Sequence, residues 1–446
     1  MDVGMEIPRE RMIMDCGGFR KVGLWLLVLV IGGSSMGACG PSPAEAGELR
    51  SDLEREVSPA VEPGDLDALV DGNTAFALDL YAALADRYDN LFYSPYSISL
   101  ALAMTYAGAR GETELEMAQT LHFDLSQARL HPAFNALDQE LAKRGEPIEL
   151  PDGEQEGFQL NIANSIWGQV DYAFLDEFLD LLALNYGAGM RIVDFIQQTE
   201  QARQQINAWV SDETEGRIED LIPEGVLDAA TTLVLANAIY FNAAWMEPFD
   251  EAATMDGIFH LLDGGQVTVP MMNQSERMRY AEGDGYQVVE RAYVGGQMVM
   301  DIILPDAGEF AAIEAAMDAA WLEGVLASLE GQQVTLSMPR FEFESEVGLT
   351  EVLQAMGMPT AFGGGADFSG MDGTRNLFIG EVLHKAFVSV DEAGTEAAAA
   401  TAVIMERGMA PQSTVEMAVD RPFIFLLRDL QTGAVLFIGR VMNPAP

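Results

Sequence analysis

Near its C-terminus the chain reads Val390-Asp391-Glu392-Ala393-Gly394-Thr395-Glu396-Ala397-Ala398-Ala399-Ala400-Thr401-Ala402-Val403-Ile404-Met405, and this stretch decides how the rest is interpreted. Its alanines favour a helix, whereas Gly394 and the final Thr-Ala-Val-Ile favour an extended chain. As a strand it has one face of small side chains only: Thr395, Ala397, Ala399 and Thr401. It contains no proline, so every backbone N–H is free to join a sheet. The stretch therefore suits either an Ala-rich surface helix or linker, or a loop that is able to enter between two strands.

The composition is that of a globular and very acidic protein. The chain has 446 residues, of which 49% are hydrophobic and 9% aromatic, enough for one large domain or two ordinary ones. Lys and Arg number 24 against 70 Asp and Glu, a net charge of −46. This charge argues against nucleic acid and anionic membranes as partners. It suits a secreted protein in a salty medium, and attraction to cationic partners is the alternative.

The N-terminus has the pattern of an export signal. Arg20-Lys21, the apolar run 22–31 and the small residues after it predict a signal peptide over residues 1–38. The run is too short to span a bilayer. The leader is unusually long, and initiation at Met12 or Met14 is the alternative to Met1. The residues before Cys39 resemble a bacterial lipobox, which predicts Cys39 as a lipidated first residue; ordinary cleavage would leave it unmodified. The expected location is extracellular, or at the outer membrane as an anchored lipoprotein.

The remaining composition signals exclude several kinds of chemistry. Cys16 and Cys39 are the only cysteines, so the mature domain is expected to lack an intrachain disulfide and any Cys-based metal or catalytic site. Residues 39–64 are rich in Pro, Ala and Glu and are predicted to be a flexible tether. No phosphate loop, zinc triad or nucleophile elbow is present, and the four histidines stand in unrelated contexts. We therefore expect no cofactor, no metal and no enzyme.

Periodicity places the main elements of a single domain over residues 65–446. Helical spacing of apolar residues predicts a helix over 66–84. A short strand should end before Pro95, with Ser94 capping the next helix. An alternating pattern over 158–162 and an apolar run over 233–241 predict two strands, the second covered on both faces. Further strands are predicted at 298–305, 334–343, 387–390, 423–427 and 434–441.

The stretch from Glu392 to Thr401 is very similar to the hinge of the reactive-centre loop in inhibitory serpins, a family of protease inhibitors. The resemblance continues in order from about Leu66 to Val441, through Phe-Tyr-Ser-Pro-Tyr-Ser-Ile at 92–98, the Asn- and Trp-containing run at 233–245, and Arg-Pro-Phe at 421–423. It implies a mixed α/β (α+β) serpin fold with three β-sheets, the central one large and mostly antiparallel. It also implies about eight or nine helices and an exposed reactive-centre loop.

The resemblance implies a mechanism as well as a fold. An inhibitory bacterial serpin acts as an irreversible suicide inhibitor: the loop is cleaved by a serine protease, or alternatively a cysteine protease, and inserts as an extra strand of the central sheet. The partner is then held in a covalent complex with a monomeric inhibitor. The rival is a non-inhibitory serpin that serves as a binding or carrier protein, for which bulky or charged residues on the small-residue face would argue. A heparin-type cofactor is not expected, because the region that would bind it offers only Lys143 and Arg144.

By the same resemblance, three groups of residues acquire conformational roles. The hinge comprises Glu392, Gly394, Thr395, Glu396, Ala397, Ala398, Ala399, Ala400 and Thr401. A buried polar cluster where the central strands part, the shutter, comprises Ser94, Ser97, Asn237 and His384. The top of the insertion path, the breach, comprises Trp245, Arg340 and Glu392, with an Arg340–Glu392 ion pair. From spacing alone, the shutter residues would be read as independent caps and core polar groups.

The position of the cleaved bond remains open between two neighbours. The usual spacing from the hinge Gly gives Gly408-Met409, and Met409 suits chymotrypsin- or elastase-like pockets. Arg407, one position earlier, suits a trypsin-like pocket with an acidic floor. We favour Arg407-Gly408 slightly.

Overall fold

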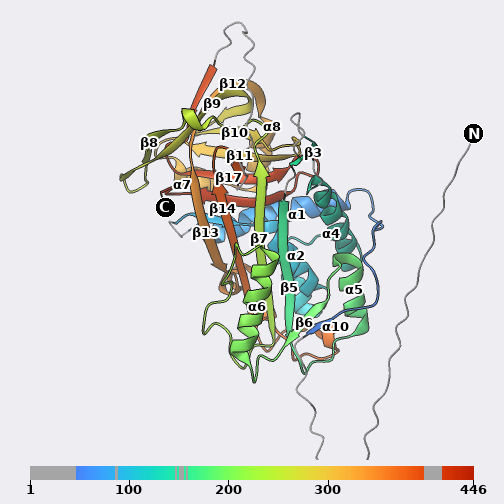
Figure 1. Ribbon diagram of the computed structural model, residues 1–446. Coiled ribbons are helices and arrows are strands. Elements are labelled where there is room, and N and C mark those ends of the chain that lie inside the picture. Colours follow the sequence, from blue (N-terminus) through green and yellow to red (C-terminus); the bar gives the residue numbers. More distant parts are fainter. Residues whose placement is uncertain are drawn as a thin grey trace, which may run out of the picture. The chain divides into compact units, whose positions relative to one another are not determined.

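Helices and β-sheets are combined throughout the described part of the chain (Figure 1). The computed structural model describes residues 47–85, 89–145, 148–149, 155–156, 159–395 and 414–445, which all belong to one compact unit. The described helices are α1 Asp65–Leu84, α2 Pro95–Tyr106, α3 Gly111–Thr120, α4 Gln127–Ala142, α5 Asp176–Tyr186, α6 Thr199–Glu213, α7 Phe310–Ala316, α8 Ala319–Ala327, α9 Thr350–Met356 and α10 Ser369–Asp372. They number ten in these ranges, where about eight or nine were expected.

A seven-stranded sheet forms the centre. Its order is β1 (Gly47–Leu49), β6 (Met190–Val193), β5 (Gln159–Gln169), β7 (Leu233–Ala244), β15 (Gly394–Thr395), β14 (Glu381–Val390) and β13 (Phe341–Gly348). The long strands β5, β7, β14 and β13 stand side by side in Figure 1, with α6 in front of the sheet and α2 behind it. β7 and β14 are parallel neighbours, and at their upper end the short β15 lies between them.

A nine-stranded sheet packs beside the central one. Its order is β16 (Thr414–Ala418), β12 (Glu330–Pro339), β9 (Gln266–Gly283), β10 (Tyr286–Ala292), β11 (Met298–Pro305), β17 (Phe423–Asp429), β18 (Val435–Val441) and β2 (Leu91–Tyr93), with β8 (Met255–His260) paired to β9. A two-stranded sheet joins β3 (Ile148–Glu149) to β4 (Gln155–Glu156). All residues of β11 and β18 are buried, as expected of strands covered on both faces.

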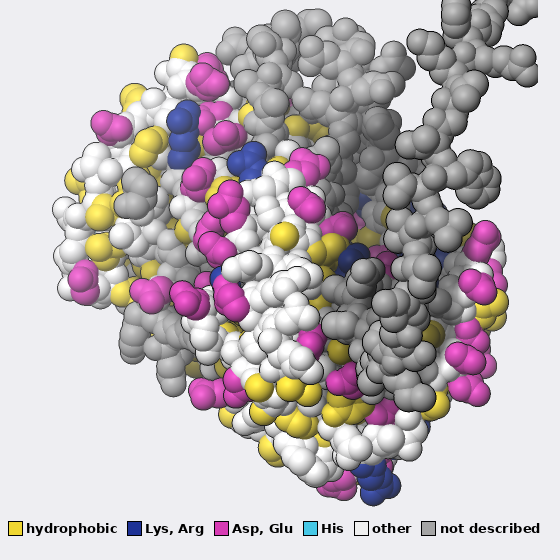
Figure 2. Space-filling model, turned by 60° about the horizontal axis from the view of Figure 1, so that its bottom comes forward, with side chains coloured by type: hydrophobic (Ala, Val, Ile, Leu, Met, Phe, Trp, Pro, Cys, Tyr) yellow, Lys and Arg dark blue, Asp and Glu magenta, His cyan; other side chains and the backbone are white. Residues whose placement is uncertain are grey.

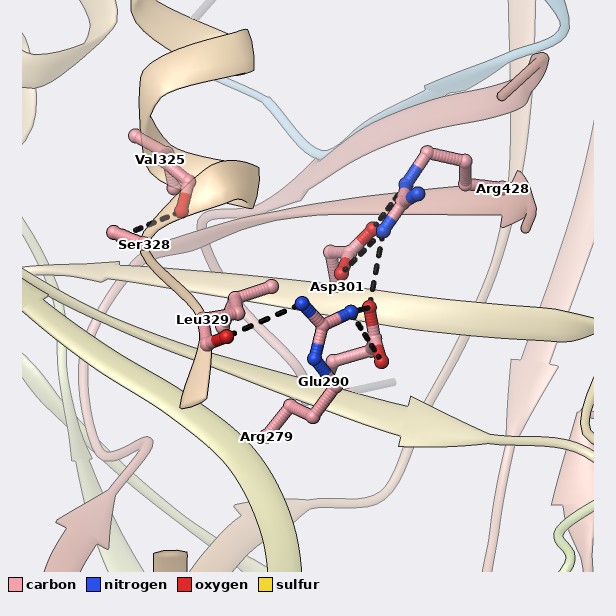
Figure 3. A network of polar contacts seen from close by, with 7 residues as sticks. All are labelled: Arg279, Glu290, Asp301, Val325, Ser328, Leu329 and Arg428. Atoms are coloured by element: carbon pink, nitrogen blue, oxygen red, sulfur yellow. Dashed lines mark hydrogen bonds and ion pairs between the residues drawn. The ribbon is translucent and has the colours of Figure 1, made fainter. Parts of the chain in front are cut away.

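Four charged side chains cross the nine-stranded sheet as a network (Figure 3). Arg428 donates from Nε to Asp301 Oδ2 at 2.9 Å and from Nη2 to Glu290 Oε2 at 3.0 Å, and Arg279 Nη1 lies 3.1 Å from Glu290 Oε2. Burial raises the pKa of Asp301 to about 6, although Arg428 opposes the rise. The network joins β9, β10, β11 and β17, and each buried carboxylate has a cationic partner, as buried charges require.

Several sequence predictions are confirmed at the level of single elements. α1 begins one residue before its predicted start, and β11 has the predicted bounds. Ser94 caps α2, because its hydroxyl accepts the N–H of Ser97 at 3.1 Å and Pro95 opens the helix. The single strand predicted over 334–343 is wrong. The chain leaves the nine-stranded sheet at Pro339 and enters the central sheet at Phe341, so the two segments are separate strands that meet at Arg340.

The tether predicted over 39–64 also differs from the structure where its residues are described. From residue 47 the chain lies against the domain: Leu49 pairs with Met190 of β6, and the N–H of Glu56 donates to Leu184 O at 2.9 Å. Arg55 Nη2 lies 2.7 Å from Asp138 Oδ2. The segment docks through backbone pairing and polar contacts, so an argument from missing apolar periodicity could not detect it. The ordered fold therefore begins before residue 65.

The charge of the surface and the length of the helices bear on which partners the protein could have. Figure 2 shows Asp and Glu side chains over several parts of the visible face, with Lys and Arg at few places. Among the described residues, no helix is long and apolar enough to cross a membrane, and no group of three or more His, Cys, Asp or Glu is placed to hold a metal ion.

Candidate functional site

The site is centred on two side chains that face each other across the β7–β14 pair. His384 of β14 is in register with Asn237 of β7, and both are buried. Burial lowers the pKa of His384 to about 3, so the imidazole is neutral at ordinary pH. Its Nε2 accepts the N–H of Ser94 at 3.2 Å, which leaves Nδ1 as the protonated nitrogen that donates to Asn237 Oδ1.

The polar network extends from Asn237 to the next strand and to α2. Asn237 Nδ2 donates to Ser97 Oγ at 2.6 Å and to Asn164 Oδ1 of β5. Asn164 in turn accepts from Ser97 Oγ at 3.1 Å and donates to Ser97 O at 3.1 Å. Asn164 is in register with Asn237, so Asn164, Asn237 and His384 form one polar rung across three strands. Such a network can exchange partners when strands separate, without leaving buried polar groups unpaired.

All four predicted shutter residues are thus brought together. Asn164 is a member that the sequence analysis missed. The signal was present as an amide in the middle of the strand Ala-Asn-Ser-Ile-Trp at 163–167, but it becomes meaningful only when the register with Asn237 is known.

Above the rung, the first residues of the hinge already lie between β7 and β14. Gly394 pairs with Ala244 and Thr395 with Ala243 on β7, while Thr395 also pairs with Val390 on β14. A Cβ on Gly394 would stand 2.2 Å from Ala243 O, so a side chain at this position would collide with backbone. Thr395 is buried, with its hydroxyl 2.8 Å from the Tyr293 hydroxyl. The strand that separates β7 from β14 has therefore begun to form.

The turn that leads into β15 is held by its own aspartate and by the end of β7. Asp391 Oδ1 accepts the N–H groups of Ala393 at 2.9 Å and Gly394 at 3.1 Å. Trp245 donates its backbone N–H to Ala393 O at 2.8 Å and its indole N–H to Asp391 O at 3.0 Å. The N–H of Phe249 donates to Glu392 O at 2.9 Å. The predicted breach residue Trp245 thus makes two hydrogen bonds to the base of the loop.

The predicted ion pair is present at the same place. Arg340 Nε lies 2.5 Å from Glu392 Oε2, and Thr254 donates its hydroxyl to Glu392 Oε1. Burial by itself would raise the pKa of Glu392, but the hydrogen bonds from Arg340 and Thr254 bring it below its ordinary value. Thr254, Phe249 and Tyr293 were not predicted, because they reach the hinge from strands and loops far away in sequence.

The other predicted residues lie outside the described part of the chain. They are the hinge residues Glu396, Ala397, Ala398, Ala399, Ala400 and Thr401, the candidate cleavage residues Arg407, Gly408 and Met409, and the lipidation residue Cys39.

A short strand entering between two parallel strands, above a buried polar rung, is the arrangement that the hinge resemblance implied, and comparison with known proteins agrees. The family model described as Serpin (serine protease inhibitor) matches residues 71–444. The chain therefore belongs to the serpin family, and its class is that of the protease inhibitors, not of the enzymes.

Individual relatives cover almost the whole chain. An uncharacterized serpin-like protein of Thermococcus kodakarensis is 37% identical over 407 residues, which cover 91% of this chain and 92% of that protein. The leukocyte elastase inhibitor of Sus scrofa is 39% identical over 394 residues, covering 85% and 100%. Among solved structures, the thermophilic serpin tengpin in its native state matches with a TM-score of 0.79 at 28% identity, covering 90% of this chain and all of that one. The serpin fold predicted from the sequence is confirmed.

Proposed function

We propose that this protein is an irreversible suicide inhibitor of serine proteases that inserts its cleaved loop as an extra strand between β7 and β14. One observation carries the proposal: Gly394 and Thr395 are already hydrogen-bonded strand residues between these two strands. Below them β7 and β14 pair directly, from Glu381–Val234 to Phe387–Tyr240. The likeness to an elastase inhibitor supports the same class of target.

Insertion replaces one interface between strands, β7–β14, by two, one on each side of the inserted strand. Insertion breaks the parallel β7–β14 pairing and creates an antiparallel pairing on each side of the new strand; antiparallel pairs are slightly the more stable per residue. Converting about ten loop residues to a ladder, at about 0.5–1.5 kcal/mol net per hydrogen bond, releases on the order of 10 kcal/mol. This equals the whole stability of a typical domain, about 5–15 kcal/mol, so it is enough to deform an attached enzyme.

The chemistry belongs to the protease. Its serine hydroxyl attacks the carbonyl of the cleaved bond, the peptide C–N bond breaks, the new amine leaves with a proton, and an ester joins the loop to the enzyme. Insertion then carries the acyl-enzyme away and distorts it before water hydrolyses the ester. A cysteine protease would form a thioester by the same steps. We propose Arg407-Gly408 as the cleaved bond, with Gly408-Met409 as the alternative, and a covalent complex with one inhibitor molecule.

The test is to mix the protein with trypsin, chymotrypsin, elastase and subtilisin and to run denaturing gels. A band that resists detergent and has the summed mass supports the proposal, and the mass of the released C-terminal peptide identifies the cleaved bond. Thr395→Arg is the test variant: Thr395 is already buried between β7 and β14, so a charged side chain there would have no partner and would keep β15 out of the sheet, and we expect cleavage without a complex. Complex formation by this variant would contradict insertion, and cleavage without any complex by the unaltered protein would contradict inhibition.

We further propose that the protein is exported and attached to a membrane through lipid on Cys39. The support is the signal-peptide pattern and the lipobox-like residues before Cys39. Mass spectrometry of the mature N-terminus tests this: the proposal requires an acylated Cys39 as first residue, and Cys39→Ala should release the protein into the medium. An unmodified Cys39 or a retained signal would refute it.

A further inference from the structure

Arg291, at the end of β10, is a buried cation placed against the segment that holds the hinge. It is 2% exposed, and its guanidinium carbon lies 4.8 Å from the ring centroid of Trp245 and 4.1 Å from that of Phe249. Its Nη2 donates to Glu247 O at 2.8 Å. We call residues 245–249 the clamp. The guanidinium of Arg291 contacts this segment at three points, the rings of Trp245 and Phe249 and the carbonyl of Glu247 between them.

The polar surroundings of Arg291 fix the guanidinium in turn. Its Nη1 donates to Gln274 Oε1 at 2.7 Å and lies 3.3 Å from Glu276 Oε1. The amide of Gln274 also donates to Glu247 O at 3.2 Å and to Pro248 O at 3.3 Å. Two side chains from β9 and β10 thus converge on the backbone of the clamp.

Burying the charged guanidinium of Arg291 costs free energy, so filling space does not by itself explain an arginine at this position. Burial lowers the pKa of Arg291 to about 10, and its Nε has no hydrogen-bond partner among the described residues. An apolar side chain would fill the same space without that cost. Nor does Arg291 belong to the network of Figure 3, which the neighbouring Glu290 joins from the same strand.

The clamp is also what the loop base binds. Its N–H groups at Trp245 and Phe249 and the Trp245 indole N–H donate to Ala393, Glu392 and Asp391 respectively. Trp245 stacks on Tyr293, with ring centroids 4.5 Å apart and planes within 9°, and the Tyr293 hydroxyl meets Thr395. A continuous set of contacts therefore runs from Arg291 to the first inserted residue.

We propose that Arg291 is a positioning residue for the hinge: it acts through the clamp to keep β15 in register between β7 and β14, and so sets the fraction of cleaved molecules that trap their protease. This inference rests on the proposed inhibitory function. Strand insertion continues from β15, so a loosely held β15 delays it. Hydrolysis of the acyl-enzyme then competes better, and more inhibitor is consumed as substrate.

Three variants of the full chain test the inference. Arg291→Met keeps the length and apolar bulk without charge, and Arg291→Lys keeps the charge. Arg144→Met is the matched control, because Arg144 is a buried arginine paired with Asp429 at 2.7 Å, beside the β17–β18 turn and not in the clamp. The first readout is hydrogen exchange of the Trp245 and Phe249 amides in the uncleaved protein. We expect exchange about tenfold faster in Arg291→Met, an intermediate rate in Arg291→Lys and no change in Arg144→Met.

The second readout is the molar ratio of inhibitor to protease at full inhibition. It should rise several-fold in Arg291→Met with an unchanged rate of loop attack, recover in part in Arg291→Lys, and stay unchanged in Arg144→Met. Unchanged exchange or an unchanged ratio in Arg291→Met overturns the inference, as does an equal rise in Arg144→Met. If Arg291→Met does not fold, Arg291→Lys against the unaltered protein carries both readouts. If the unaltered protein traps no protease, the proposed function fails, while hydrogen exchange still decides whether Arg291 positions the hinge.

Discussion

Acidification is the perturbation that should act most directly on the polar rung. The folded-state pKa of His384 is about 3 because the ring is buried, whereas its ordinary value is 6.5. The unfolded chain therefore takes up the proton first, so the stability contributed by the neutral ring is present above about pH 6.5 and is lost as the pH falls towards 3. At about 1.4 kcal/mol per pKa unit, the loss between pH 7 and pH 4 is about 3 kcal/mol.

The molecule contains a matched control for this effect. His131 is also buried, with its pKa lowered to about 3, mainly by burial, but it lies against the Tyr186 hydroxyl at 2.6 Å and not in the rung. Urea unfolding at pH 7 and pH 4 should show that His384→Asn and His131→Asn each lose about 3 kcal/mol less stability than the unaltered protein on acidification.

The two histidines should differ in what acidification does to the sheet. A protonated His384 has no lone pair left to accept the N–H of Ser94, so the β7–β14 seam should open more readily at pH 4. We expect the unaltered protein and His131→Asn to convert on standing at pH 4 to a heat-stable form that no longer inhibits, and His384→Asn to convert no faster at pH 4 than at pH 7. The reasoning is refuted if His384→Asn loses as much stability between pH 7 and pH 4 as the unaltered protein does.

Three further predictions concern single contacts. Gly394→Ala would place a methyl group against Ala243 O, so it should destabilise the native fold by about 1–3 kcal/mol and yield cleavage without a complex on gels; a normal complex would contradict the close approach. Asp301 has a folded pKa of about 6, above its ordinary value of 3.8. The stability that its protonated carboxyl contributes is therefore present at low pH and falls as the pH rises from 4 to 6. Relative to Asp301→Asn, the unaltered protein should lose about 3 kcal/mol over that range in urea unfolding, and a constant difference would contradict this. Glu392→Gln should cost only about 0–1 kcal/mol in thermal melting, because Arg340 is nearly half exposed; a larger loss would mean that solvent screens the pair less than we infer.

The elements that the sequence predicted well are those whose signals are local. The Ser94-Pro95 cap and the apolar run of β11 each depend on residues adjacent in the chain, whereas the hinge role of Gly394 came from the family resemblance. The shutter residues could be named only through the family resemblance, because nothing in their spacing brings Ser94 near His384.

What the sequence could not predict depends on register between distant strands. Asn164 gains its role from a pairing with β7, and Arg291 from rings about forty residues earlier in the chain, so no periodicity signals either. The docking of residues 47–64 was missed for a related reason: it uses backbone groups and single ion pairs, which leave no pattern of apolar residues. The division at Arg340 was missed because two strands of different sheets follow each other with almost no turn between them.

The pairing pattern also explains why the sheet should open at one seam. β5 and β7 pair antiparallel from Gln159–Asn242 to Gly168–Leu233, and β13 and β14 pair antiparallel along the whole of β13. β7 and β14 are parallel, the less stable arrangement per residue, and β15 already replaces their contact at one end. Opening the β5–β7 or the β13–β14 seam would break antiparallel pairs, and the other parallel seam of the sheet, β5–β6, has no strand between its members from which insertion could continue among the described residues. Opening therefore breaks a parallel interface that β15 has already entered, while an inserted strand forms antiparallel pairs with both of its neighbours.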